Sequence, residues 1–152
     1  MQIIGIDYGD SKTGVALSDS LGLMAHGLKT IFSSSVKKII NEIKHIANQY
    51  NVGIIVVGLP KNMNNTLGER AKITLEFIDR LKEALSCEVV TWDERLSTVS
   101  ATNILNETDK TGKKRKAIID TVAAEIILQS YLDYKRKLDE TGGNMYNGRT
   151  DR

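Results

Sequence analysis

The stretch IIGIDYGDSKTGVALSD, residues 3–19, contains two short apolar runs separated by a polar turn with glycines. This pattern predicts a hairpin with strands over 2–8 and 14–19. Asp7 interrupts the first apolar run before the turn begins, where an uncompensated carboxylate is costly. Asp10 is better placed to form the turn, so Asp7 is a candidate functional residue. The alternative is a turn-forming aspartate that caps nearby backbone N–H groups.

Length and composition indicate an ordinary globular protein. The chain has 152 residues, of which 41% are hydrophobic and 26% are charged. This length predicts one domain with a substantial core, over residues 1–138, and a flexible C-terminal tail over 139–152. Aromatic residues make up only 5% of the chain, so base stacking cannot be the main mode of recognition.

Charge and cysteine content narrow the class further. The net charge of +2 is too small to indicate nucleic-acid binding unless the basic residues cluster. Cys87 is the only cysteine, which excludes an internal disulfide and fits a reducing compartment. No apolar run approaches the roughly 20 residues of a membrane helix, and the N-terminus lacks the pattern of a secretory signal. We therefore expect a cytoplasmic protein.

Helical and strand-like patterns alternate after the hairpin and a third strand near 27–32. The predicted elements are a helix over 36–50 capped by serines 33–35, a strand over 53–60, a loop over 61–68, a helix over 69–85, a strand over 87–92, a helix over 97–106, a basic loop over 107–116 and a helix over 117–138. This order predicts an α/β fold with a mixed five-stranded sheet flanked by helices. The first three strands are expected to be antiparallel and the others parallel.

A second acidic candidate follows the last predicted strand. Asp93 and Glu94 come directly after EVVTW, and residues past the carboxyl ends of such strands gather at the functional edge of a sheet. Aspartate is the better helix cap by residue type, so Asp93 suits a structural role. Glu94 is the stronger functional candidate.

Asp120 is the third acidic candidate. On a helix it shares a face with the residues three, four, seven and eleven positions later. Those residues are Ala123, Ala124, Ile127 and Tyr131, whereas Glu125, Gln129 and Asp133 are predicted to take the opposite side. A carboxylate on the apolar stripe is rarely buried without a partner. The alternative is a first-turn aspartate stabilised by the helix dipole.

Three carboxylates at the ends of core elements would repel one another without a counter-charge. Oxygen ligands of this kind suit Mg²⁺ or Mn²⁺. Zinc is not indicated, because His26 and His45 stand alone and no cysteine–histidine set is present. Asp7, Glu94 and Asp120 are therefore the candidate metal ligands.

Basic residues cluster before the last predicted helix. Lys110 and the run Lys113, Lys114, Arg115 and Lys116 occupy a position where helix N-termini favour acids. A solvated surface loop and a phosphate-binding loop both explain such a run. The other basic candidates beside the proposed site are Lys12, Lys61, Arg70 and Arg95. A nucleic acid whose phosphates contact these cations would bring one phosphodiester to the metals.

With these residues identified, the chain resembles the YqgF family, the RuvC-like branch of the RNase H-like nucleases. The resemblance covers roughly residues 3–138 and rests on four motifs in order. They are GIDYGDSKTGVALSD, VVGLPKNMNNT, DERLST and IIDTVAAEIILQSYL. It implies an RNase H-like fold and acidic metal-site residues at Asp7, Glu94 and Asp120. The roles that it implies are processing of the 5′ end of pre-16S ribosomal RNA or resolution of four-way DNA junctions.

Two departures from the family pattern bear on that choice. Lys12 and Thr13 stand where the family usually has arginine and isoleucine, and lysine lacks the bidentate grip of arginine on phosphate. Related resolvases carry a fourth acid where this chain has Ala123. The missing acid favours the RNA role, with the Holliday junction resolvase as the alternative.

The hypothesis is therefore metal-assisted phosphodiester hydrolysis. Asp7 would bridge two ions about 3.5–4 Å apart, and Glu94 and Asp120 would each complete one site. Two other classes remain open on the sequence. An actin-like ATPase also begins with Asp-x-Gly after an apolar strand, and a non-catalytic nucleic-acid-binding module would keep the same fold.

Overall fold

The computed structural model describes residues 1–60, 68–94 and 112–146, with 112–120 and 141–146 described as backbone only. The strands are β1 (Gln2–Asp7), β2 (Lys12–Ser18), β3 (Ala25–Phe32), β4 (Val52–Leu59) and β5 (Glu88–Asp93). The helices are α1 (Val36–Gln49), α2 (Glu69–Ala84) and α4 (Gly112–Tyr146). The predicted helix over 97–106 and the loop residues 61–67 lie outside the described residues.

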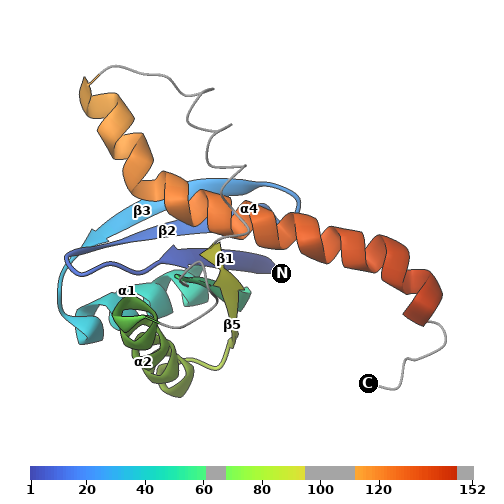
Figure 1. Ribbon diagram of the computed structural model, residues 1–152, viewed down its shortest axis with the longest axis horizontal. Coiled ribbons are helices and arrows are strands. Elements are labelled where there is room, and N and C mark those ends of the chain that lie inside the picture. Colours follow the sequence, from blue (N-terminus) through green and yellow to red (C-terminus); the bar gives the residue numbers. More distant parts are fainter. Residues whose placement is uncertain (61–67, 95–111, 147–152) are drawn as a thin grey trace.

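The strands form one mixed sheet in the order β3-β2-β1-β4-β5 (Figure 1). The β1–β2 and β2–β3 pairs are antiparallel, and the β1–β4 and β4–β5 pairs are parallel. The predicted α/β fold with a mixed five-stranded sheet is confirmed. Parallel strands end at the same edge, so the carboxyl ends of β1, β4 and β5 lie together.

β1 is the central strand, and its residues alternate between two packed faces. Ile4 and Ile6 belong to the core beneath α1 and α2, whereas Ile3 packs against α4. Gly5 lies on the α4 face, where an added Cβ would stand 2.6 Å from the Cβ of Leu128. Because side chains alternate along a strand, Asp7 shares the α4 face with Ile3 and Gly5.

α1 and α2 cover one face of the sheet, and α4 crosses the other (Figure 1). The hydroxyl of Ser35 accepts a hydrogen bond from the N–H of Lys38, which satisfies one free donor of the first turn of α1. This confirms the prediction of a serine cap. None of the helices in the described part of the chain is long and apolar enough to cross a membrane.

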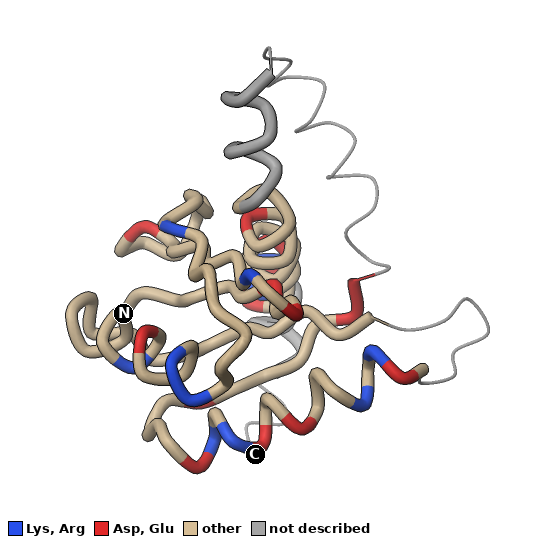
Figure 2. The backbone as a smooth tube through the Cα atoms, turned by 90° about the vertical axis from the view of Figure 1, so that its left-hand side faces the viewer, with Lys and Arg blue, Asp and Glu red and all other residues tan. Residues whose placement is uncertain are grey.

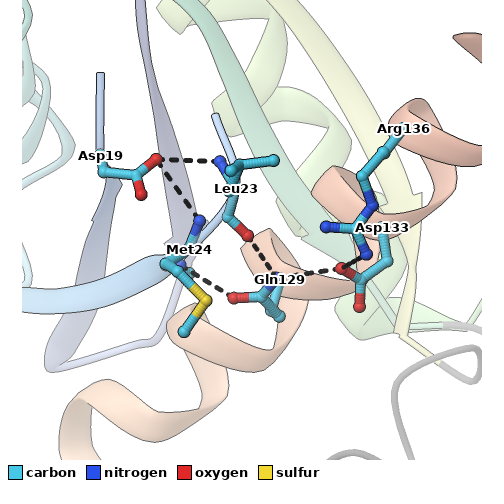
Figure 3. Close-up of polar contacts among 7 residues, drawn as sticks. Asp19, Leu23, Met24, Gln129, Asp133 and Arg136 are labelled. Carbon is cyan, nitrogen blue, oxygen red and sulfur yellow. Dashed lines mark hydrogen bonds and ion pairs between the residues drawn. The ribbon is translucent and has the colours of Figure 1, made fainter. Parts of the chain in front are cut away.

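α4 differs from the predicted helix in the residues that it turns towards the sheet. It crosses β1, β2 and β3, so residues beside its apolar stripe meet the edge strand instead of solvent. Gln129 donates to the carbonyl of Leu23 at 2.9 Å and accepts from the N–H of Ala25 at 2.8 Å (Figure 3). Glu125 lies over Gly27, where an added Cβ would be 2.9 Å from its Oε1. The prediction that Glu125 and Gln129 face away from the sheet is wrong.

α4 also extends beyond its predicted bounds at both ends. Residues 112–116 are helical, so the prediction of a basic loop there is wrong. Lysine and arginine are good helix formers, and a helix already fixed downstream extends easily through them. The C-terminal end of α4 passes residue 138, and the division into a domain and a tail stays a prediction.

Candidate active site

Asp7 is the last residue of β1, where it pairs with Gly14 of β2. Its position at the carboxyl end of the central strand places it beside the ends of β4 and β5. Burial raises the pKa of the Asp7 carboxyl, and the positive charge of Arg70 opposes this shift. The structure therefore confirms the strand-end position of Asp7 and makes its negative charge costly.

Glu94 lies one residue beyond β5 and reaches back over β4. An added Cβ at Gly58 would stand 2.9 Å from Oε2 of Glu94 and 2.4 Å from Cδ1 of Ile127. Gly58 thus leaves the space through which the Glu94 side chain crosses β4 towards Asp7. Sequence analysis missed this role of Gly58, although a glycine inside a β-branched strand is a signal of close approach.

The carboxylates of Asp7 and Glu94 interact electrostatically. The pKa of Glu94 is raised to about 7, first by burial and then by the negative charge of Asp7. Asp93 adds a smaller rise, and Arg70 lowers the pKa. Near neutral pH a proton on Glu94 therefore relieves the repulsion between the two carboxylates, and a bound cation could relieve it in place of the proton. This is the environment that a divalent ion favours.

A pocket of about 550 Å³ opens at this edge of the sheet. Its lining residues are Asp7, Tyr8, Gly9, Asp10, Ser11, Lys12, Gly14, Pro60, Arg70, Glu94 and Ala123. The structure thus brings together two predicted acidic residues and two predicted basic residues, Lys12 and Arg70. Lys61 and Arg95 lie outside the described residues.

Ala123 brings α4 to the wall of this pocket. Asp120 is three residues earlier on the same helix and is described as backbone only. Residues three apart share a helix face, so the backbone is consistent with a third carboxylate near the pocket. The run 113–116 lies further along the same helix. The roles of Asp120 and of these basic residues stay predictions.

Arg70 is held at the pocket by two neighbours that sequence analysis did not select. Its Nη2 donates to the carbonyl of Tyr8 at 2.5 Å, and its Nη1 contacts Oδ1 of Asp10 at 2.6 Å. The Tyr8 ring stacks on Phe77 of α2, with centroids 4.0 Å apart and planes within 6°. No local pattern indicates these contacts, because they join the first hairpin to α2.

The residues of the pocket fit a hard divalent cation. Its acidic side chains supply carboxylate oxygens, and none of the described residues that line it is a histidine or a cysteine. Among residues whose side chains are described, no group of three metal-ligating side chains is present. Asp7 and Glu94 form a pair in which burial raises the pKa of both carboxyls, and the negative charge of Asp7 raises the pKa of Glu94 further. Mg²⁺ and Mn²⁺ accept such a set and complete their coordination with water.

The strand order, with Asp7 at the end of the central strand β1 and Glu94 one residue beyond the edge strand β5, is that of the RNase H-like class of nucleases. Two solved structures share the fold. RuvC of Thermus thermophilus, in complex with a Holliday junction substrate, has a TM-score of 0.64 at 15% identity, over 90% of this chain and 96% of that one. The resolvase of Fowlpox virus, in complex with Holliday junction DNA, has a TM-score of 0.53 at 14% identity, over 88% and 98%.

The chain belongs to the RuvX family, which is the YqgF family named above. The model of this family, described as Holliday junction resolvase, matches residues 1–134. Relatives named "Putative pre-16S rRNA nuclease" include one from Halothermothrix orenii, 50% identical over 138 residues, which are 91% of this chain and 99% of that protein. Another, from Thermoanaerobacter pseudethanolicus, is 51% identical over 137 residues, or 90% and 99%. The predicted family and the prediction of a phosphodiester-hydrolysing nuclease are confirmed.

Proposed function

We propose that this nuclease requires divalent metal ions and acts on pre-16S ribosomal RNA, where it processes the 5′ end. The observation that carries the metal requirement is the pairing of Asp7 and Glu94, two carboxylates from separate strand ends with raised pKa values in one pocket. With ribosomal RNA precursor as its substrate, the protein would act in the cytoplasm.

Asp7, Glu94 and Asp120 would hold the metal. When bound, Mg²⁺ or Mn²⁺ would lower the pKa of a water nucleophile and stabilise charge on the leaving oxygen. Arg70 and Lys12, on the pocket wall, bind the phosphates that flank the scissile bond. We extend this basic surface to the remaining candidates, Lys61, Arg95, Lys113, Lys114, Arg115 and Lys116.

Two observations favour RNA over branched DNA. The relatives at about 50% identity carry the name of a pre-16S rRNA nuclease. In addition, Ala123 presents a methyl group to the pocket where related resolvases have a fourth acid. The second candidate, cleavage of four-way DNA junctions, is favoured by the family description and by the shared fold of RuvC.

The test offers the purified protein a 16S precursor fragment and a synthetic four-way junction, each with Mg²⁺, Mn²⁺ or EDTA. We expect metal-dependent cleavage of the RNA, and a loss of at least about 100-fold in Asp7→Asn, Glu94→Gln and Asp120→Asn. Asp79→Asn is the matched control, because Asp79 is an exposed acid of α2 outside the pocket. Circular dichroism checks that each variant is folded.

Three outcomes would contradict parts of the proposal. Wild-type cleavage by any of the three variants would remove that residue from the set of essential ligands. Preferential cleavage of the junction would replace the RNA role with the resolvase role. Binding that survives EDTA, with no cleavage of either substrate, would support the non-catalytic module.

Metal binding has its own readout. Trp92 is the single tryptophan of the chain and lies two residues before Glu94. Titration of Mn²⁺ or Mg²⁺ is expected to change its emission in the wild type, with weaker affinity at pH 6 than at pH 8. The reason is that protons compete with the metal for Glu94, whose pKa is about 7. Calorimetry checks the affinities independently.

A further inference from the structure

We propose that Asp10 competes with substrate phosphate for Arg70, so that the carboxylate of the chain occupies a phosphate subsite until nucleic acid displaces it. This inference rests on the proposed function, because it assigns a substrate group to the same pocket. The ligand class is a phosphodiester next to the scissile one.

The first step is that Arg70 is anchored. One of its amino groups donates to the Tyr8 carbonyl at 2.5 Å, and its guanidinium carbon lies 5.6 Å from the centre of the Tyr8 ring. The Tyr8 ring also stacks on Phe77, which is 2% exposed and belongs to the core. Arg70 and Phe77 are seven residues apart on α2, so one helix face holds both. The guanidinium is therefore fixed beside Asp7, the neighbour of Tyr8.

The second step concerns the other amino group. Nη1 of Arg70 contacts Oδ1 of Asp10 at 2.6 Å, and both residues line the pocket that holds Asp7 and Glu94. The Asp10 side chain is 86% exposed, whereas that of Arg70 is 37% exposed. An ion pair so open to water is weak and easily exchanged. Arg70 thus combines a fixed position with a replaceable partner.

The third step is chemical equivalence. Carboxylate and phosphate oxygens are both acceptors that match the fork of a guanidinium. A phosphodiester entering the pocket would meet Arg70 in the place of Asp10 and would also be repelled by the Asp10 charge. Removal of that charge is therefore expected to strengthen binding.

A purely structural role makes the opposite prediction. If the Asp10–Arg70 pair served only to hold the turn between β1 and β2, its loss would loosen Arg70. Nucleic-acid binding would then weaken, and the melting temperature would fall. Acidic and basic positions are interspersed along α2 (Figure 2), so an exposed acid of this helix outside the pocket can serve as the control for a general charge effect.

The experiment measures fluorescence anisotropy of a labelled 12-nucleotide RNA of mixed sequence, in EDTA so that no cleavage occurs. The proteins are the wild type, Asp10→Asn, Arg70→Gln, the double variant and Asp79→Asn. Asp79→Asn removes one exposed negative charge from α2 outside the pocket. Glutamine at position 70 removes the positive charge but can still donate to the Tyr8 carbonyl. Arg70→Met, which also lacks the positive charge, replaces Arg70→Gln if the glutamine variant does not fold.

We expect Asp10→Asn to bind the RNA roughly two- to fivefold more tightly, the range that an exposed ion pair represents. Asp79→Asn should change affinity less than that. Asp10→Asn should add nothing beyond the control effect when Arg70 is already replaced.

Two results would overturn the inference. Unchanged or weaker binding by Asp10→Asn would assign the pair a structural role. Equal tightening with and without Arg70 would show general repulsion instead of competition for one subsite. RNA binding is measured in EDTA, whereas the proposed function is tested by metal-dependent cleavage. The two experiments can therefore fail independently, and each failure can be recognised.

Discussion

Glu94 shows how one residue acquires its chemistry from distant parts of the chain. In an unfolded chain its carboxyl would be ionised well below neutral pH, whereas burial beside Asp7 raises its pKa to about 7. The folded protein therefore retains a proton that the unfolded chain releases. The metal-free protein loses this part of its stability as the pH rises from about 4.5 towards 7.

Glu94→Gln should remove this pH dependence. In EDTA at pH 8, we expect the variant to melt a few degrees above the wild type, because about 1 kcal/mol corresponds to about 2–4 °C for a domain of this size. At pH 5 the difference should shrink, since wild-type Glu94 is then protonated when folded. Thermal melts followed by circular dichroism check this, with exposed Glu76→Gln as control. An equal gain at both pH values would contradict the assignment.

Gly58 and Gly53 form a matched pair on β4. A Cβ at Gly58 would meet Ile127 in the core and Glu94 in the site, whereas the three atoms nearest to a Cβ at Gly53 all belong to the flexible, exposed side chain of Met1. We expect Gly58→Ala to lose about 1–3 kcal/mol of unfolding free energy through overpacking. It should also lose at least about tenfold in cleavage rate through displacement of Glu94.

Gly53→Ala should change both quantities little, because the Met1 side chain can move aside. Urea unfolding and single-turnover cleavage measure the two variants. Full activity of Gly58→Ala would show that Glu94 reaches the pocket without the space that Gly58 leaves.

At the scale of elements, α4 connects the open edge of the sheet to the site. The turn between β2 and β3 is ordered by Asp19, whose Oδ1 accepts from the N–H groups of Leu23 and Met24 (Figure 3). Gln129 of α4 then bonds to this segment, so the edge strand and the helix are fixed together. The amide of Gln129 satisfies one backbone group of the edge strand, the N–H of Ala25, and one of the turn before it, the carbonyl of Leu23.

Gln129→Ala should therefore weaken the attachment of α4 to the sheet. It leaves the part-buried N–H of Ala25 without its acceptor, and we expect a cost of about 1–2 kcal/mol. Hydrogen exchange should show faster exchange at Ala25, while the amides of β1 change less. Ser130→Ala on the same helix is the control. Unchanged protection at Ala25 would contradict this role for Gln129.

At the scale of the whole molecule, α4 lies opposite α1 and α2, so the two faces of the sheet can carry different functions (Figure 1). The acidic residues and Ala123 belong to the α4 side of the carboxyl edge, and Arg70 reaches the same pocket from the α2 side. Net charge is only +2, so substrate binding must depend on where the cations lie.

Replacement of Lys113, Lys114 and Lys116 with alanine tests that dependence. We expect weaker RNA binding and a shallower plot of log affinity against log salt, by about 0.7 per lost phosphate contact with a single strand. The matched control replaces Lys37, Lys38 and Lys44, three exposed lysines of α1 on the opposite face. An equal loss of RNA affinity in both triple variants would indicate a general charge effect, in which the position of the lysines does not matter.

Much of the fold was predictable because its signals are local. Short apolar runs, helical spacing and the serines before Val36 indicated the five strands, α1 and α2. The path of α4 over β3 was not predictable, because the positions of Glu125 and Gln129 depend on the angle at which the helix crosses the sheet. The extension of α4 through residues 112–116 was missed because a basic run has no periodic apolar signal.

The sequence by itself determined that Asp7 and Glu94 lie at the ends of strands, since those strands are recognisable from neighbouring residues alone. Only the tertiary structure decided how deeply these carboxylates are buried and which charges lie beside them. The gap at Gly58, the anchoring of Arg70 by Tyr8 and the raised pKa of Glu94 all arise between segments far apart in the chain. Burial and electrostatic repulsion are properties of packed neighbours, and no local stretch of residues encodes them.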